Sequence, residues 1–303
     1  MRYGLPYKGS KNAIAEWIVS ELPGADVFVD LFFGGGAVTH AAMLSGKYKR
    51  FIINDIDARL PKLFIDCANG LYTPENHPEW ISRKEFNERK DTDAYIALIW
   101  SFGNNGKDYL YGADIEELKE AYHKAVYFDN PALLEPFGYK VSKSGKNGVY
   151  ERYLDYSRQI KGMSVETELA NRQVEIERLQ SLQSLQSLQS FGSDYQQVPI
   201  PENAVIYCDI PYNDTNCGKY DGFDHERFYK WAERQDNIYI SEYSMPGNFK
   251  RYARKEKCIL SAANGNDQKA EEILFTNQKT YEKLNDDKKD MAAWNFAEQM
   301  TLF

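Results

Sequence analysis

The chain has 303 residues, of which 43% are apolar, and its formal net charge is −8 at pH 7. This length fits one large α/β domain, or a catalytic domain that carries an insertion. No apolar run approaches the roughly 20 residues of a membrane span, and the four cysteines lack the spacing of a zinc site or a disulfide framework. We therefore expect a soluble cytosolic protein without bound metal, in which contact with nucleic acid would need a local cluster of basic residues.

The first 55 residues predict the opening unit of a doubly wound parallel sheet. Apolar residues at helical spacing, a capping serine and a closing Pro-Gly predict the first helix. Three consecutive glycines then separate a buried strand from a second helix. The expected elements are a helix over 12–22, a strand over Val27–Leu31, a glycine turn at 34–36, a helix over 37–45, and a strand over 51–53 that ends in Asn54-Asp55.

The pattern changes between residues 60 and 160, where helices and loops rich in aromatic residues replace alternating strands and helices. This change indicates an insertion. Strand patterns then return, with one helix between them, so we expect the sheet to resume after the insertion. The expected elements are strands over 204–209, 237–243 and 272–276 and a helix over 223–234.

Residues 178–191 form a low-complexity segment in which leucine recurs every three residues, separated by Gln-Ser. On an α-helix this spacing drifts by about 60° per repeat, so the leucines spiral around the helix instead of forming one stripe. The period is not a heptad, which argues against a coiled coil. We expect a helix, expanded by repetition and packed on the sheet.

The glycine turn is a candidate nucleotide-binding site. Glycines at a strand end let the backbone pass close to a ligand, and a carboxylate at the end of the next strand can bind ribose hydroxyls. Asp55 lies 19 residues after Gly36, close to the spacing that this role requires. Taken alone, the pattern fits a dinucleotide, a nucleotide or S-adenosylmethionine equally well.

The segment Asp209-Ile210-Pro211-Tyr212 narrows this choice, because it follows a predicted strand in the crevice where such sheets bind ligands. An adenine amino group has two N–H donors, and the Asp209 carboxylate and the Ile210 carbonyl can accept both. The nitrogen lone pair then becomes available to attack a methyl sulfonium. Tyr212 can stack on the base once the base has left the duplex.

Asp209–Tyr212 closely resembles the Asp-Pro-Pro-Tyr motif of amino-group DNA methyltransferases, and Asp30–Gly36 resembles their cofactor motif. Tyr7-Lys8-Gly9-Ser10-Lys11 is similar to the aromatic-x-Gly-Gly-Lys signature of the Dam-type adenine-N6 group, with serine in place of the second glycine. Asp194-Tyr195 stands where that group has an acid followed by an aromatic residue. The order of these four motifs resembles that of the Dam-type group, and Ile210 and Leu31 depart from the family pattern by replacing prolines.

The resemblance implies a Rossmann-like, doubly wound α/β methyltransferase sheet with an inserted, mainly helical target-recognition domain. It also implies transfer of a methyl group from S-adenosyl-L-methionine to adenine N6 by base flipping. The expected domains are catalytic at 1–60 and 160–285, target recognition at 61–159, and a tail at 286–303. The implied cofactor-binding residues are Tyr7, Lys11, Asp30, Phe32, Gly34, Gly36, Asp55, Asp194 and Tyr195, and the implied catalytic residues are Asp209, Ile210, Pro211 and Tyr212.

Two stretches of the insertion are candidates for contact with double-stranded DNA. Residues 101–111 combine amide side chains, glycines and aromatic residues, and they are similar to runs in phage-associated adenine methyltransferases. Residues 139–158 carry an excess of basic over acidic residues, with tyrosines interleaved. The expected contacts are Asn104, Asn105, Lys107 and Tyr109 in the first stretch and Lys140, Lys143, Lys146 and Arg152 in the second.

The last five residues resemble the peptide that binds the bacterial sliding clamp, with Gln299, Leu302 and Phe303 at the matching positions. The alternative is that Leu302 and Phe303 fold back onto the domain. We expect a monomeric, cytoplasmic, nucleoid-associated protein that a bacterium or a phage encodes, within or outside a restriction-modification system.

Three other functions remain open on the sequence. A methyltransferase for an RNA base or a protein amide uses similar chemistry, but it usually lacks a long insertion before the second motif. A nucleotide-binding oxidoreductase would use the glycines and Asp55, but it leaves Lys11 and Asp209–Tyr212 without a role. An inactive relative would bind DNA without methyl transfer. The sequence does not specify the recognised bases.

Overall fold

The computed structural model describes residues 3–73, 80–160, 178–182, 184–212, 222–260 and 267–286. The chain divides into two compact units, which we call the sheet unit and the helical unit. The sheet unit comprises Glu16–Phe33, Ser45–Ile56 and Ser187–Phe303. The helical unit comprises Met1–Ala15, Gly34–Leu44 and Asp57–Gln186.

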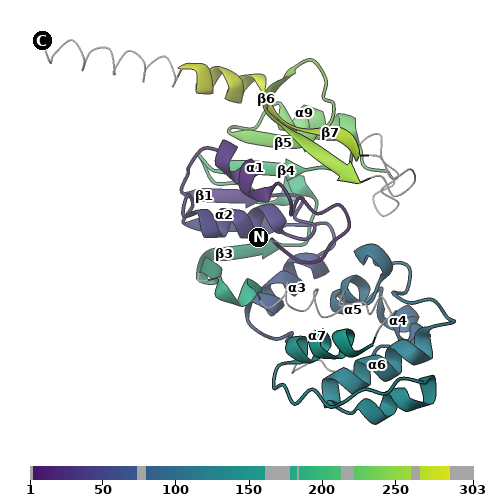
Figure 1. Cartoon of the computed structure of the whole chain (residues 1–303). Helices are drawn as coiled ribbons and strands as arrows, with labels where there is room; N and C mark the ends of the chain where they lie inside the picture. The colour runs from purple at the N-terminus through teal and green to yellow at the C-terminus, as the bar shows by residue number, and fades with distance from the viewer. Residues whose placement is uncertain are drawn as a thin grey trace, which may run out of the picture. The chain divides into compact units, whose positions relative to one another are not determined.

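The described part of the sheet unit contains one seven-stranded sheet in the order β3-β2-β1-β4-β5-β7-β6 (Figure 1). Strands β1 to β5 run parallel, and β7 is antiparallel to both β5 and β6. This topology confirms the predicted α/β sheet. The strands are β1 (Val27–Asp30), β2 (Arg50–Asn54), β3 (Leu188–Phe191), β4 (Val205–Asp209), β5 (Ile238–Glu242), β6 (Phe249–Leu260) and β7 (Asp267–Asn277).

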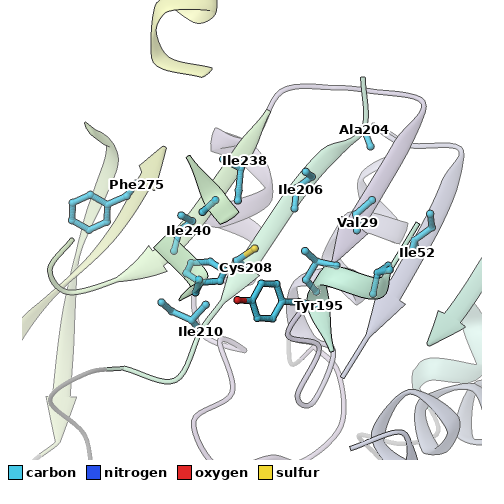
Figure 2. Close-up of a cluster of buried hydrophobic side chains, with 14 of the residues drawn as sticks. Val29, Ile52, Tyr195, Ala204, Ile206, Cys208, Ile210, Ile238, Ile240 and Phe275 are labelled. Atoms are coloured by element: carbon cyan, nitrogen blue, oxygen red, sulfur yellow. The ribbon is translucent and has the colours of Figure 1, made fainter. Parts of the chain in front are cut away.

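An apolar cluster of the sheet unit lies on one face of the sheet (Figure 2), and the opposite face of the central strands is buried as well. Because side chains alternate between faces along a strand, every second residue of the central strands enters this core. Val29, Ile206 and Ile240 are at most 1% exposed there. Helix α9 (His225–Ala232), whose first turn Asp224 caps by accepting from the Arg227 N–H, contributes Phe228. The core therefore holds the strand ends in fixed register.

Helix α1 (Ala15–Glu21) and a helical segment at 278–286 complete the described regular structure near the sheet, with the short turn η5 (Tyr195–Gln197). None of the described helices combines the length and the apolar character needed to cross a bilayer. The elements of the helical unit are α2 (Ala37–Ser45), α3 (Arg59–Ala68), α4 (Arg83–Arg89), α5 (Ala94–Ile99), η1 (Phe102–Asn104), α6 (Glu116–Phe128), η2 (Pro131–Phe137), α7 (Val149–Gln159), η3 (Arg178–Ser181) and most of η4 (Ser184–Ser187).

Helices α6 and α7 of the helical unit pack around a second buried core. Tyr122, Val126, Tyr153 and Tyr156 are at most 3% exposed in this cluster. The apolar faces recur at helical spacing, which is why these segments form helices instead of strands. The described elements between 59 and 160 contain helices and turns but no strand assigned to the sheet.

The leucine repeat does not form the α-helix that we expected. Its described residues form the 3₁₀ turns η3 and η4 and then strand β3. A 3₁₀-helix has three residues per turn, so a three-residue leucine period returns to the same side, whereas on an α-helix it spirals. Leu179 and Leu182 are accordingly buried, while Leu188 begins the strand. The helix prediction for this segment is wrong for that reason.

Helix α2 anchors the N-terminal segment of the helical unit through His40. The Gly4 N–H donates to His40 Nδ1 at 3.0 Å, and the rings of Tyr3 and His40 meet edge to face with centroids 5.5 Å apart. Burial lowers the pKa of His40 to about 4. Because Nδ1 must accept from Gly4, the neutral ring is the form that the fold requires.

This contact predicts a pH-dependent loss of stability. The unfolded chain takes up a proton near pH 6.5, whereas folded His40 resists protonation until about pH 4. Unfolding therefore becomes easier as the pH falls between these values, by about 3 kcal/mol at pH 4. In His40→Gln the amide oxygen can still accept from Gly4, so urea unfolding between pH 6.5 and 4 should show a flatter pH dependence. Identical slopes for both proteins would contradict this role.

Candidate active site

Polar side chains gather at the edge of the sheet where the parallel strands end. Asp30, Asn54, Asp209 and Glu242 are the last residues of β1, β2, β4 and β5. Asp30 and Glu242 are each 2% exposed. Strand β1 pairs with β2 on one side and with β4 on the other, so the chain order reverses here. Doubly wound sheets bind ligands at such a switch point.

The segment Asp209–Tyr212 leaves β4 at this edge. Asp209 is half-buried and pairs in register with Ser241 of β5. The side chain of Ile210 is 2% exposed and packs in the core of the sheet unit (Figure 2). The carbonyl of Pro211 accepts a hydrogen bond from His225 Nε2 at 2.8 Å, which requires the proton on that nitrogen. The motif is thus held by side-chain packing and by its backbone.

Tyr212 ends the motif with its ring held at two points. Its hydroxyl donates to Glu272 Oε1 at 2.7 Å, and its ring meets that of Tyr243 at 70° with centroids 4.6 Å apart. Burial, followed by the nearby charges of Asp209 and Glu272, raises the pKa of Tyr212 above its usual range. The phenol therefore remains a hydrogen-bond donor at physiological pH.

Phe32 and Tyr195, both expected at the cofactor, lie together in the sheet unit. Their ring centroids are 5.5 Å apart, and both rings pack on Phe228 of α9. Tyr195 is only 6% exposed. Asp55, which follows β2, is 4% exposed. The structure thus brings these residues to the same unit as Asp30 and Asp209.

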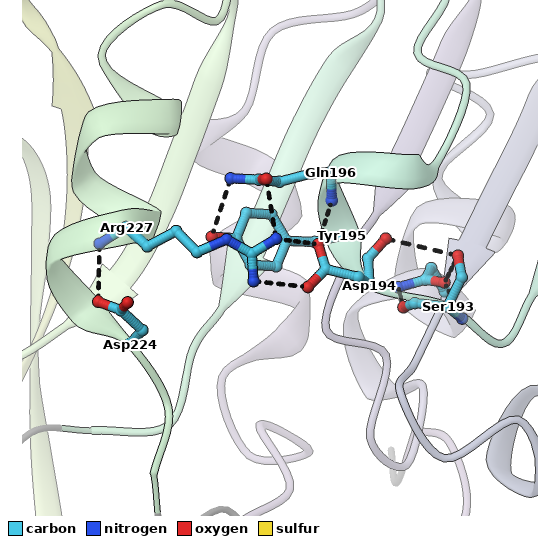
Figure 3. Close-up of polar contacts among 7 residues, drawn as sticks. Ser193, Asp194, Tyr195, Gln196, Asp224 and Arg227 are labelled. Atoms are coloured by element: carbon cyan, nitrogen blue, oxygen red, sulfur yellow. Dashed lines mark hydrogen bonds and ion pairs between the residues drawn. The ribbon is translucent and has the colours of Figure 1, made fainter.

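Asp194 forms an ion pair at the start of η5 (Figure 3). Its carboxylate accepts from two nitrogens of Arg227, at 2.9 and 3.1 Å, and from the Gln196 N–H. The Arg227 guanidinium also lies over the Tyr195 ring, 5.6 Å from its centroid. The fork-like pairing fixes the loop ahead of Tyr195 to helix α9.

Asn54 connects the glycine-motif strand with this loop, a role that our sequence analysis did not assign. Its amide nitrogen donates to the carbonyls of Leu31 and Ser193 at 3.1 and 3.0 Å. Its amide oxygen accepts from the backbone N–H and the hydroxyl of Ser193. Asn54 is 1% exposed, so these hydrogen bonds are formed away from water. A polar residue at the end of an apolar strand was the signal that could have identified it.

His225 and Glu272 were also missed. His225 opens helix α9 in a segment that looks like any capped helix start. Glu272 lies within β7, where it directly follows another acidic residue, Glu271, and nothing in the sequence distinguishes the two. Both contact the motif only because the fold brings distant segments together, so no local pattern indicated them.

The glycine turn lies in the helical unit, against the N-terminal segment. The Leu5 N–H donates to the Gly35 carbonyl at 2.7 Å. A Cβ on Gly34 would lie 3.2 Å from Tyr7 Cε1, and one on Gly35 would lie 2.6 Å from Tyr7 Cβ. Gly34 and Gly36 also adopt positive φ, at 50° and 70°. Only glycine fits this close approach.

Lys11, the basic residue of the N-terminal signature, is 7% exposed within the helical unit. Its carbonyl accepts from the Ile14 N–H at 2.9 Å, in the turn that leads into α1. A lysine is rarely buried to this degree unless its charge is paired. The signature thus places Tyr7 on the glycine turn and Lys11 inside the unit.

The first stretch expected at DNA is a tightly bonded turn. Asn104 Nδ2 donates to the Leu98 carbonyl at 2.8 Å. Asn105 Oδ1 accepts from the N–H groups of Lys107 and Asp108, and its Nδ2 donates to the Asp108 carboxylate. Tyr109 is 8% exposed, with its hydroxyl donating to the Ile81 carbonyl. Lys107 is exposed, so it is the most accessible of the four expected contacts.

The second stretch presents its lysines on an anchored loop. Asp129 accepts from the N–H groups of Ser144 and Gly145 at 2.8 and 2.9 Å. Gln159 of α7 exchanges two hydrogen bonds with the backbone of Ser142. Three basic residues of the loop are exposed and Arg152 is half-buried; the exposed ones are Lys140, Lys143 and Lys146. The anchors hold the loop in one shape, with these lysines outward.

The candidate clamp-binding residues Gln299, Leu302 and Phe303 lie outside the described residues.

Fold and site together define a class. A doubly wound sheet with an acid-Ile-Pro-Tyr motif at its switch point is consistent with a Rossmann-like methyltransferase. The family follows from comparison: the model of the D12 class N6 adenine-specific DNA methyltransferases matches residues 7–284. The chain belongs to this family of enzymes, which confirms the predicted family and reaction class. A comparison with curated proteins finds no match.

The Asn54 contacts predict a stability effect. In Asn54→Leu the Leu31 and Ser193 carbonyls lose their amide donor and the Ser193 N–H loses its acceptor, so the free energy of unfolding should fall by about 2–4 kcal/mol. Denaturant unfolding measures this change. The control is Gln189→Ala on the exposed part of β3, which should stay within about 0.5 kcal/mol of wild type. Equal unfolding midpoints for Asn54→Leu and wild type would refute the role.

Proposed function

We propose that the protein transfers the methyl group of S-adenosyl-L-methionine to the N6 amino group of an adenine that has flipped out of double-stranded DNA. The observation that carries this proposal is the position of Asp209–Tyr212. The motif leaves β4 beside the end of β1, at the switch point of the sheet. Family membership supports adenine methylation, and this geometry supports Asp209 as the residue that contacts the reacting nitrogen.

The residues of the motif divide the chemistry between them. The Asp209 carboxylate and the Ile210 carbonyl accept the two N–H groups of adenine N6, which turns its lone pair toward the methyl carbon. Attack of N6 on the methyl carbon would form the N–C bond as the sulfur–methyl bond breaks and leave a neutral thioether. The positively charged amine would then pass one N–H proton to solvent water. Pro211 is fixed by His225, and Tyr212 stacks on the flipped base. Ile210 meets this requirement because the role uses its carbonyl, while its side chain fills the core.

The residues of the sheet unit fit S-adenosylmethionine, which supplies an electrophilic methyl group on a positively charged sulfonium. Buried carboxyl groups at Asp30 and Asp55 suit a cationic ligand with ribose hydroxyls. Phe32 and Tyr195 provide an aromatic wall. Asp30 and Phe32 lead directly in sequence into Gly34–Gly36, where a Cβ would block a close backbone approach. We include Tyr7, Lys11 and Asp194 in the proposed cofactor set.

DNA contact is proposed for the helical unit, through Lys107 and the anchored loop that carries Lys140, Lys143 and Lys146. Exposed lysines on a fixed loop neutralise phosphates at low conformational cost. Asn104, Asn105, Tyr109 and Arg152 shape these two surfaces and remain proposed contacts. The domain limits, the clamp-binding tail, the monomeric state and the nucleoid location stay predictions.

Replacing Asp209 tests the proposed chemistry. Asp209→Ala should lower methyl transfer by about 10²-fold or more, because one acceptor for the amino group is lost, while S-adenosylmethionine binding changes little. The measurement uses labelled S-adenosylmethionine with mixed-sequence DNA, followed by digestion and nucleoside analysis. Asp236→Ala is the matched control, since Asp236 is exposed and pairs with Lys279. The proposal is wrong if the wild-type protein forms no N6-methyladenine, or if wild type and Asp209→Ala form it at the same rate.

The triple variant Lys140→Ala/Lys143→Ala/Lys146→Ala tests the anchored loop. It should weaken DNA binding for all sequences alike and make the negative slope of log K against log salt concentration less steep by about 3. A second triple variant, Lys62→Ala/Lys84→Ala/Lys230→Ala, has the same change in net charge; its lysines are exposed and lie beside acidic residues. Equal salt slopes for the two triple variants would place the DNA elsewhere.

A further inference from the structure

The buried carboxyl group of Glu272 lies at the same sheet edge as Asp209, although its strand is antiparallel to β5. Residue Glu242, the last of β5, pairs with Ile273. Strand β7 runs opposite to β5, so Glu272, which precedes Ile273, lies one residue past the end of β5. It is therefore level with the residues that follow the parallel strands. Glu272 is 1% exposed. A carboxyl group buried to this degree is costly unless it is hydrogen-bonded.

The pairing also determines which face of the sheet Glu272 occupies. Side chains alternate along a strand, so Glu272 and Leu274 point to the same face of β7. Leu274 pairs with Ser241, and Ser241 pairs with Asp209. Glu272 therefore shares a face with Asp209, opposite to the face that carries Ile206 and Ile240. Its partner on this face is the Tyr212 hydroxyl at 2.7 Å.

This hydrogen bond leaves the Tyr212 ring little freedom. One end of the side chain is fixed by the backbone, which His225 holds at Pro211. The far end is fixed by Glu272, and the ring packs against Tyr243. The hydroxyl lies on the axis of the last side-chain torsion, so the Glu272 hydrogen bond fixes the direction in which the ring points. Packing on Tyr243 restrains rotation of the ring about that axis. The ring plane is thus set within the free protein.

We propose that Glu272 is a positioning residue that orients the Tyr212 ring for stacking on the flipped adenine. This inference rests on the proposed function, since it assumes that Tyr212 meets the base. Glu272 does not touch the base. It acts through the phenol, and a carboxylate suits this role because it accepts a strong hydrogen bond from a group that keeps its proton.

Orientation matters because the adenine N6 must point its lone pair at the methyl carbon while Asp209 and the Ile210 carbonyl accept its protons. Small errors in the position of reacting groups cost large factors in rate. A Tyr212 ring free to tilt would hold the base less firmly in that geometry. The effect should therefore fall on kcat, while the KM for S-adenosylmethionine stays near that of wild type.

Four variants separate positioning from simple structural support. Glu272→Leu removes the acceptor, Glu272→Gln keeps an acceptor oxygen, and Tyr212→Phe removes the donor but keeps the ring. The control is Glu271→Gln, since Glu271 points to the other face and pairs with solvent-exposed Arg254. Each variant is assayed for kcat and KM on a duplex that contains the site at which wild type forms N6-methyladenine.

Glu272→Leu and Tyr212→Phe should each lower kcat about tenfold, Glu272→Gln should stay within about threefold of wild type, and Glu271→Gln should equal wild type. The double variant Tyr212→Phe/Glu272→Leu should be no slower than either single variant, because both remove one interaction. Coupling of this kind identifies the hydrogen bond itself as the cause.

A spectroscopic readout tests stacking directly. In a duplex with 2-aminopurine at the target position, with S-adenosylhomocysteine present, flipping raises the fluorescence and stacking on Tyr212 quenches part of it. Glu272→Leu should be brighter than wild type, and Glu272→Gln should match wild type. Two results with an active wild type would overturn the inference. In the first, Glu272→Leu has the kcat and the fluorescence of wild type. In the second, Glu272→Gln and Glu272→Leu are equally slow and neither changes the fluorescence. If the wild-type protein forms no N6-methyladenine, the proposed function is wrong, and the role of Glu272 is not the cause of that failure.

Discussion

The parallel pairing of β1 with β4 is the contact on which the arrangement of this protein depends. It places Asp30 opposite Tyr207 and so brings the end of the glycine-motif strand beside the Asp209 motif, although residues 57–186 of the helical unit lie between them in sequence. A parallel pair needs a long crossover, because the chain must return to the same edge. The chain between β2 and β3 carries residues 57–186 of the helical unit, so this large unit adds to the chain without disturbing the central strands.

Strands buried on both faces could be predicted, because they read as short continuous apolar runs. This holds for β1, β2, β4 and β5, and the predicted strand at 272–276 is the inner part of β7. The two strands at the edges of the sheet were missed. Strand β3 has exposed residues at its centre, and β6 begins with several basic residues. Edge strands need only one apolar side and gain from charges that block further pairing, so they lack the buried-strand pattern.

The same limit applies to the candidate site. Several residues expected from motifs, among them Asp30, Asp55 and Asp209, stand at the ends of parallel strands, where the chain direction alone brings them to one edge of the sheet. Their supports come from elsewhere: Asn54 holds the Ser193 loop, and His225 and Glu272 hold the two ends of the Pro211-Tyr212 pair. A support residue is selected by the geometry of a distant partner, so its local sequence can be ordinary. The supports became visible only with the register of β7 and the position of α9.

The distribution of charge is compatible with a DNA substrate, although the protein is acidic overall. Several carboxyl groups lie inside the sheet unit at the strand ends, where Glu242 accepts from the Tyr243 N–H and Glu272 from Tyr212. Burying them costs stability, and proteins retain such costs mainly at functional sites. Buried carboxyl groups at this edge suit the cationic methyl donor that we propose. The anchored loop of the helical unit instead exposes three lysines to solvent. The net charge of −8 sums the charges of the whole chain, so it does not describe either of these two local groups, and only their separate positions bear on the proposed contacts.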